Sequence, residues 1–213
     1  MIDRRASQTP VRHQGDRPTC VGFAVSGAHE WMAADTTIRS PEDAVWAGHQ
    51  IASIPGREET AVAWSLRGLE LHAHTTEQAW PYGTPHWSHG RPAAARQNVS
   101  LRPLPSWRQL PTLTLDSIRS ELRDGNAVIV TLRVVRSAWR TADGVIDAAP
   151  GRKTPGNHAV LAVASSEAAE QPERIVIKNS WGVNWGDSGY GVVTGRYLDH
   201  YGVRAHVVEP TTP

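Results

Sequence analysis

The chain has 213 residues, and its formal net charge is +1 because 22 lysines and arginines nearly balance 21 aspartates and glutamates. A chain of this length can bury a core large enough to fold without metal ions or disulfide bonds. The even balance of charge does not point to nucleic acid or an anionic membrane as a partner, so partners have to be inferred from a site.

Apolar residues at steps of three and four predict helices in the first half of the chain. One helix begins at Cys20 and has an apolar face made of Val21, Ala24, Val25, Ala28 and Met32. A second begins after Ser40, a good N-cap residue that is followed by a proline at the first helical position. A third spans about residues 61–71, with Val62, Leu66 and Leu69 facing inward.

The second half has a different pattern. Residues 81–113 contain many prolines and few periodic apolar residues, which predicts an irregular crossing. A short helix through Leu115, Ile118 and Leu122 follows and ends at Gly125. Short β-branched runs then predict antiparallel strands at 127–135, 159–164, 174–178, 190–194 and 203–208. We therefore expect an α+β fold, with a mainly helical lobe at 1–112 and a mainly β lobe at 113–213 that together form one domain.

Cys20 is the only cysteine, so it cannot form a disulfide within the chain. Taken alone, such a residue is most often a small buried hydrophobe. Here, however, Gln14 shortly precedes it, and His158 and Asn179 follow far downstream. A cysteine, a distant histidine and then an asparagine is the chain order of one known cysteine-nucleophile arrangement. The order therefore favours a catalytic thiol.

These residues and their neighbours resemble the papain-like cysteine peptidases. The resemblance rests on Gln14-Gly15, on Phe23-Ala24 and above all on the segment 177–191, which reads IKNSWGVNWGDSGYG. It runs from about Thr9 to about Val208. It implies a two-lobed papain-like fold in which a helical lobe faces an antiparallel β lobe across a cleft, in a bacterial-type form without disulfides or a long propeptide.

The resemblance also implies a role for each candidate residue. Cys20 would be the nucleophile, held as thiolate by the helix N-terminus and by the imidazolium of His158. His158 would then give its proton to the departing amine. Asn179 would orient the histidine ring by accepting a hydrogen bond, and Trp181 would cover that bond from water. Gln14 and the backbone N–H of Cys20 would stabilise the oxyanion.

The chain departs from the family pattern near the nucleophile. Family members usually have a disulfide-bonded cysteine three residues before the catalytic one, and Arg17 stands there, followed by Pro18. We expect Pro18 to stiffen this loop. Only about eight residues precede the region that resembles the family, so an inhibitor or regulatory partner is expected in place of a propeptide.

A second departure concerns substrate binding. Where family members commonly have a pair of glycines that approach the substrate backbone, this chain has Glu58, Glu59, Thr60 and Ala61. Side chains there predict weaker strand pairing, and the two carboxylates predict a preference for basic residues. The expected substrate-binding residues are Glu59, Thr60, Ala61, Gly156, Asn157 and Trp185.

The predicted function is a papain-like thiol hydrolase that cleaves peptide or related amide bonds in a peptide or protein substrate through a cysteine acyl-enzyme. One alternative is an acyltransferase or peptide ligase that uses the same acyl-enzyme, because the first half-reaction is identical. A second alternative, from another class, is a non-catalytic binding module that retains the fold.

We expect no cofactor and no metal. His72, His74, His86 and His89 are possible ligands, but no cysteine or carboxylate completes a set with familiar spacing. The N-terminal residues contain no apolar segment of signal-peptide length, and no stretch approaches the ~20 apolar residues of a membrane span. Together with the single thiol, these features predict a cytoplasmic location and no membrane partner.

Overall fold

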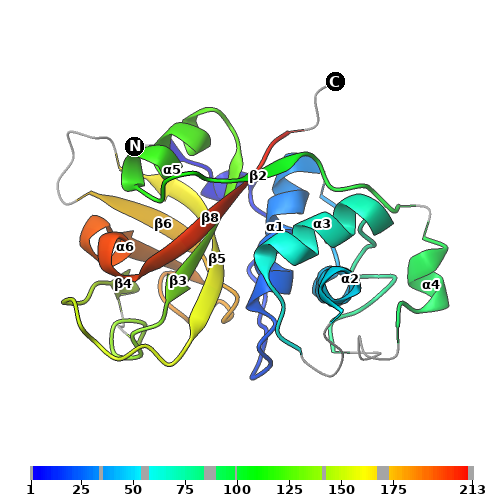
Figure 1. The fold of residues 1–213 in the computed structure, drawn as a ribbon, viewed down its shortest axis with the longest axis horizontal. Coiled ribbons are helices and arrows are strands. Elements are labelled where there is room, and N and C mark those ends of the chain that lie inside the picture. The colour runs from blue at the N-terminus through cyan, green and yellow to red at the C-terminus, as the bar shows by residue number, and fades with distance from the viewer. Residues whose placement is uncertain are drawn as a thin grey trace.

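The helices of the first hundred residues gather on one side of the molecule, and the sheet lies on the other side together with the later helices (Figure 1). The computed structural model describes residues 2–33, 36–53, 58–83, 90–98, 100–140, 143–166 and 173–210. The helical side contains α1 (Cys20–Ala33), α2 (Pro41–Ala52), α3 (Val62–His72) and the short α4 (Ala93–Arg96). No helix among the described ranges is both long enough and apolar enough to traverse a bilayer.

The helix boundaries follow the sequence signals closely. The side chain of Ser40 accepts a hydrogen bond from the backbone N–H of Asp43 at 3.3 Å, so Ser40 is the N-cap of α2 as predicted. Val62, Leu66 and Leu69 are buried on the inner face of α3. Cys20 is the first residue of α1, which places its side chain at the positive end of that helix.

The other lobe is built on one sheet. Its strands are β1 (Ile2–Asp3), β2 (Trp107–Gln109), β3 (Ala127–Arg133), β4 (Val145–Ile146), β5 (Asn157–Ser165), β6 (Arg174–Lys178), β7 (Tyr190–Thr194) and β8 (Gly202–Val208). Their order is β2-β8-β3-β5-β6-β7-β4, and β1 pairs with β5. All pairings are antiparallel except that of β4 with β7. The predicted strands are thus confirmed, as is the α+β class.

Short elements depart from the prediction. The expected lobe boundary after residue 112 is wrong in detail, because β1 pairs with β5 and β2 pairs with β8, so both lie in the sheet. α4 and β2 both interrupt the crossing that was expected to be irregular. α6 (Gly195–Tyr201) and β4 were also not predicted. The missed strands have two or three residues and the missed helices have four and seven residues, so they contain too few periodic positions to be found by periodicity.

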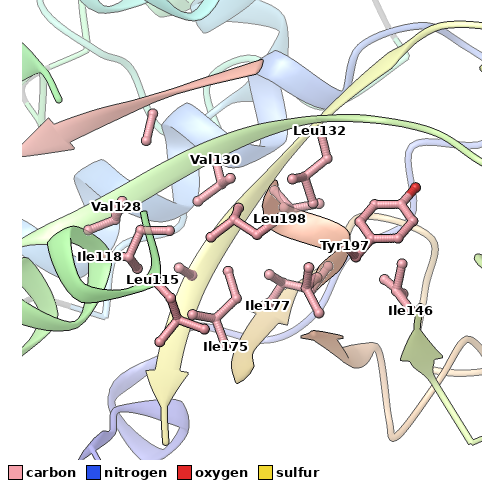
Figure 2. Packing of buried hydrophobic residues seen from close by; sticks show 14 of the residues in the cluster. Leu115, Ile118, Val128, Val130, Leu132, Ile146, Ile175, Ile177, Tyr197 and Leu198 are labelled. Atoms are coloured by element: carbon pink, nitrogen blue, oxygen red, sulfur yellow. The ribbon is translucent and has the colours of Figure 1, made fainter. Parts of the chain in front are cut away.

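Two apolar cores lie on the two faces of the sheet. The larger one packs α5 (Leu115–Arg123) and α6 against one face, as Figure 2 shows for Ile118, Val130 and Tyr197 among others. The second lies between the opposite face and helices α1 to α3, and it joins residues such as Ala28, Leu66 and Leu161. This second core holds α1 beside β5, so it sets the position of the two elements that carry Cys20 and His158.

Candidate active site

Cys20 and His158 come together from the two lobes. Cys20 begins α1, and His158 is the second residue of β5, where it is only 5% exposed. The thiol of Cys20 is hydrogen-bonded to the imidazole of His158. Nε2 of His158 is engaged with the Oδ1 atom of Asn179 at 2.7 Å, so the other ring nitrogen, Nδ1, is the one that can face the sulfur.

The electrostatics of this contact favour an ion pair. Burial alone raises the pKa of the Cys20 thiol, but the charge of His158, the hydrogen bond from His158 and backbone N–H groups of Ala159 and Val21 lower the pKa below its ordinary value. Burial likewise lowers the pKa of His158, whereas the charge of Cys20 and hydrogen bonds to Cys20 and Asn179 raise it overall. The two shifts have opposite directions, so both stabilise thiolate beside imidazolium.

Asn179 orients the histidine ring. The Oδ1 atom of Asn179 accepts hydrogen bonds from Nε2 of His158 and from the backbone N–H of Ser180, the latter at 2.8 Å. Asn179 is 4% exposed. The indole of Trp181 lies over the imidazole with ring centroids 4.9 Å apart. A further indole, Trp139, meets the same ring edge-on at 5.3 Å. Two aromatic rings therefore exclude water from the bond between His158 and Asn179.

Gln14 lines the same groove as Cys20 and is held in place by two hydrogen bonds. Its Oε1 atom accepts from the hydroxyl of Ser180 at 2.6 Å, and its Nε2 atom donates to the carbonyl of Arg17 at 2.7 Å. The second hydrogen on Nε2 remains available as a donor. The backbone N–H of Cys20, at the first turn of α1, has no hydrogen-bond partner within the described ranges. Gln14 and Cys20 line the same groove, so these two donors can receive an oxyanion there.

A groove of about 790 Å³ runs between the lobes over Cys20 and His158. Five of the predicted substrate-binding residues line it, namely Glu59, Thr60, Ala61, Gly156 and Asn157. Trp185 is absent from the lining. Its indole N–H donates to the carbonyl of Trp139 at 2.9 Å and its ring packs against Trp181. Trp185 therefore holds in place the two indoles that cover His158.

Thr60 corrects an expectation about the groove. Its hydroxyl is buried, and it lies 2.3 Å from where a Cβ at Gly48 of α2 would be, so the side chain points into the helical lobe. The backbone N–H and C=O of Thr60 form no hydrogen bond with another described residue. Because the side chain of Thr60 points away from the groove, it does not block the backbone N–H and C=O of the same residue. An extended peptide in the groove can form hydrogen bonds with these two backbone groups.

Arg17 ties the loop before Cys20 to the neighbouring wall of the groove. Its Nε atom donates to Glu58 at 2.8 Å, its guanidinium pairs with the fully buried carboxylate of Glu42, and it lies 4.8 Å from the ring centroid of Tyr82. The hydroxyl of Tyr82 in turn donates to the carbonyl of Gln14 at 2.7 Å. An ion-pair network thus stands where the family pattern has a disulfide, in addition to the predicted stiffening by Pro18.

Histidines elsewhere do not form a metal site in the part of the chain that is described. No group of three or more histidine, cysteine, aspartate or glutamate side chains is placed there to hold a metal ion. His74 is fully buried and contacts His29, with 3.0 Å between the two Nδ1 atoms. His86 and His89 lie outside the described residues.

Several residues of the site were not found from the sequence. Ser180 directly follows Asn179, and its hydroxyl holds Gln14. Its position in the Asn-Ser-Trp-Gly segment is the sequence feature that could have indicated a role in the site. Trp139 is one of nine tryptophans and stands in no motif. Arg136, Arg140, Arg204 and His206 line the groove although they are far from Cys20 in sequence. Only the folded chain brings them there.

Known proteins are similar to this chain in sequence. The family model described as papain family cysteine protease matches residues 1–211. Cysteine proteinase 2 of Leishmania pifanoi is 27% identical over 98% of this chain and 48% of its own length, and the oryzain gamma chain of Oryza sativa subsp. japonica is 33% identical over 85% and 51%. The chain spans about half the length of the curated relatives it matches.

Solved structures agree on the fold. Digestive procathepsin L 3 of the Tenebrio molitor larval midgut superposes with a TM-score of 0.81 at 20% identity, over 99% of this chain and 69% of that one. Xylellain, a cysteine protease from Xylella fastidiosa, gives a TM-score of 0.77 at 18% identity, over 96% and 83%. The papain-like two-lobed fold is thereby confirmed.

Proposed function

The chain belongs to the papain family of cysteine proteases, and on that premise we propose that it hydrolyses peptide bonds through an acyl-enzyme on Cys20. The observation that carries the proposal is the contact between the partly exposed thiol of Cys20 and the imidazole of His158, with Asn179 on the far side of the ring. A cysteine with a lowered pKa, a histidine with a raised pKa and an orienting amide are the parts that nucleophilic catalysis needs.

In the first half-reaction the thiolate of Cys20 attacks the scissile carbonyl carbon and a C–S bond forms. Negative charge moves to the carbonyl oxygen, where the Nε2 hydrogen of Gln14 and the backbone N–H of Cys20 can stabilise it. The proton on His158 passes to the amide nitrogen, the C–N bond breaks and the amine leaves. The product on the enzyme is a thioester. Asn179 and the two indoles keep the ring of His158 in one orientation throughout.

In the second half-reaction, water attacks the thioester carbonyl while His158, now neutral, accepts a proton from that water. The C–S bond breaks, and the acid product leaves with its new hydroxyl group. An amine in place of water would give acyl transfer or ligation by the same steps. We favour hydrolysis because the groove is open to solvent at its exposed lining residues, such as Glu59, Gly156 and Asn157, so water reaches it freely.

We further propose that substrate binds as an extended strand along Thr60. Thr60 lines the groove from the helical lobe, and its backbone N–H and C=O form no hydrogen bond with another described residue, while Gly156 and Asn157 line the groove from the sheet lobe. Backbone pairing of this kind gives affinity for peptides in general, and side-chain pockets give selectivity. We therefore expect unfolded proteins and peptides as substrates.

The ion pair is tested by alkylation. Iodoacetamide should modify Cys20 at a rate that stays high below neutral pH, because the thiolate survives there while His158 remains protonated. In His158→Ala the rate should fall with decreasing pH as it does for an ordinary thiol. Identical pH profiles for the two proteins would show that Cys20 and His158 do not form an ion pair.

Hydrolysis and acyl transfer are separated by product masses. A peptide substrate is incubated with and without an added primary amine, and the acyl product is weighed. We expect the free acid in both reactions. A dominant amide product at millimolar amine would establish the acyltransferase instead, and an absence of any product with an alkylatable Cys20 would favour the non-catalytic module.

Location and regulation remain proposals of their own. The lone thiol favours the cytoplasm, which fractionation of the native cell would test. A regulatory partner or inhibitor would have to cover the groove over Cys20. Protection of Cys20 from iodoacetamide in a cell extract, relieved on dilution, is the expected sign of such a partner.

A further inference from the structure

The charges that line the groove are mainly positive. Among the described residues, the lining contains one carboxylate, that of Glu59, together with the guanidinium groups of Arg136, Arg140 and Arg204. Glu58, the other acid of the expected pair, is ion-paired with Arg17 and does not line the groove. The sequence predicted an anionic groove that prefers basic residues, whereas the folded groove has an excess of cations.

Arg204 is placed within reach of a bound peptide. It is paired with Thr131 across β8 and β3, and Thr131 is paired with Ala159 across β3 and β5. Residues paired in register point to the same face of a sheet, so Arg204, Thr131 and Ala159 lie on one face. Neighbouring strands are about 4.8 Å apart, and Arg204 and Ala159 are two strands apart, so their Cα atoms are roughly 10 Å apart. Ala159 directly follows His158. An extended peptide advances about 3.4 Å per residue, so its second or third residue from the scissile bond comes level with Arg204.

The guanidinium of Arg204 has no structural partner in the described part of the chain. It is exposed and forms no ion pair or side-chain hydrogen bond there. Arginines that serve the fold of this protein behave differently, because Arg12, Arg91 and Arg119 each pair with a carboxylate. An unpaired arginine in a substrate groove can form a charge-assisted bidentate bond to a ligand carboxylate.

His206 adds a second, independent sign of a missing ligand. It lies two residues further along β8, on the same face as Arg204, and it lines the groove. It is 1% exposed, yet neither ring nitrogen has a hydrogen-bond partner within the described ranges. Burial and the charge of Arg204 lower its pKa to about 4, so the ring is neutral at pH 7 and has one N–H to donate. A buried donor without an acceptor is unfavourable, and an oxygen atom from a ligand would relieve that cost.

We propose that Arg204 and His206 form a carboxylate-binding pocket in the groove, and that the protein therefore prefers peptides with Asp or Glu two or three residues from the scissile bond. Arg136 and Arg140 extend the same preference to peptides of net negative charge by attracting them to the groove. The inference rests on the proposed peptidase activity and specifies its substrate class.

The test compares matched fluorogenic peptides that differ at one position, where they carry Asp, Asn or Lys. The position is moved along the peptide over three residues on each side of the cleaved bond. We expect kcat/KM for the Asp peptide to exceed that for the Asn peptide by about tenfold at one position, with the Lys peptide slowest. Arg204→Gln should abolish most of this preference, and Arg204→Glu should make the Lys peptide the fastest. The matched control Arg102→Gln removes an exposed arginine outside the groove and should leave the preference intact.

His206→Leu keeps the pocket filled but removes the N–H. We expect it to raise KM for the Asp peptide severalfold and so to lower the ratio of kcat/KM for the Asp peptide to that for the Asn peptide. Equal kcat/KM for all three peptides, or a preference that survives Arg204→Gln, would overturn the inference while the peptidase activity stands. If none of the peptides is cleaved although Cys20 still reacts with iodoacetamide, the proposed function fails and the inference fails with it.

Discussion

The two lobes are stabilised in different ways. The sheet lobe packs α5, α6 and the strands around a large apolar core in which buried ionic groups are few. The helical lobe instead buries charged side chains among its helices, including Glu30, Glu42, Asp43 and Arg91. The nucleophile therefore comes from a lobe stabilised by ion pairs, and the histidine comes from a lobe stabilised by apolar contact.

The ion pairs of the helical lobe have specific partners. Arg91 donates from Nη2 to Asp43 at 2.6 Å and from Nη1 to the carbonyl of His72 at 2.9 Å, while Asp43 also accepts from the backbone N–H of Thr75. Such pairs add little net stability over apolar residues of the same shape, but they are costly to break on one side only. These ion pairs fix one arrangement of the loops that surround α2. They also make the stability of the helical lobe sensitive to substitution of either partner alone.

The largest expected effect is on kcat, and it comes from the two residues that meet between the lobes, Cys20 and His158. Cys20→Ala and His158→Ala should each lower kcat by about 10⁴-fold or more, because one removes the nucleophile and the other its proton donor. Asn179→Ala should leave a measurable remainder, since it removes an orienting group only. Steady-state kinetics on one peptide provides the comparison. If Cys20→Ala with Asn179→Ala is far worse than Cys20→Ala alone, the residues do not act as a unit.

The contrast in stability is tested by breaking one buried ion pair. Arg91→Ala leaves the carboxylate of Asp43 buried without its partner and should cost about 3–5 kcal/mol of unfolding free energy in urea titrations. Replacing both residues, as in Arg91→Met with Asp43→Leu, should recover much of that loss. The surface pair of Arg196 with Asp147 is the control, and Arg196→Ala should hardly move the midpoint. A loss in Arg91→Ala no greater than in this control would contradict the contrast.

The dependence of stability on pH should show the effect of His206 in the sheet lobe. Its folded pKa of about 4 is below the ordinary value of 6.5, so between those pH values the unfolded chain binds more protons than the folded one. The contribution of His206 to stability is therefore present above about pH 6.5 and is lost as the pH falls towards 4. The unfolding free energy of wild type minus that of His206→Leu should therefore fall as the pH is lowered through this window, because the leucine variant has no ring to protonate. A difference that is constant from pH 7 to 4 would rule out a buried neutral ring.

The smallest effect concerns the tie between Arg17 and Glu58. Both side chains are partly exposed, so the pair is expected to contribute about 1 kcal/mol or less. Glu58→Gln should lower kcat/KM by a factor of about two to five through a looser groove wall. Glu70→Gln, which breaks an exposed pair with Arg67 on α3, should not change kcat/KM. Equal effects of the two substitutions would mean that Arg17 and Glu58 do not position the groove.

Much of the fold was predictable because its signals are local. The face of α1, the N-cap of α2 at Ser40 and the end of α5 at Gly125 depend on residues within one or two helical turns. Gly125 has a φ of +87°, which a glycine adopts without strain. β1 and β4 were missed because two-residue strands are defined only by the strand beside them.

In the candidate site, too, some features were predictable from the sequence and others were not. Cys20, His158, Asn179 and Gln14 were predicted by their order and neighbours in the sequence, and the folded chain brings all four together. The charge of the groove was predicted wrongly. Glu58 and Glu59 are adjacent in sequence and were visible as an acidic pair, but only the tertiary contact of Glu58 with Arg17 shows that one of these charges is neutralised.

The sequence by itself determined which chemistry we propose for this protein, because the residue types of Cys20, His158 and Asn179 and their order along the chain can be read without knowing what surrounds them. Only the tertiary structure decided what the groove attracts. Arg204 and His206 lie on β8, Arg136 and Arg140 follow β3, and the sheet places them beside residues of α1 and the loop before α3. Electrostatic attraction depends on distance in space and on which charges are already paired, and neither quantity is encoded in local sequence patterns.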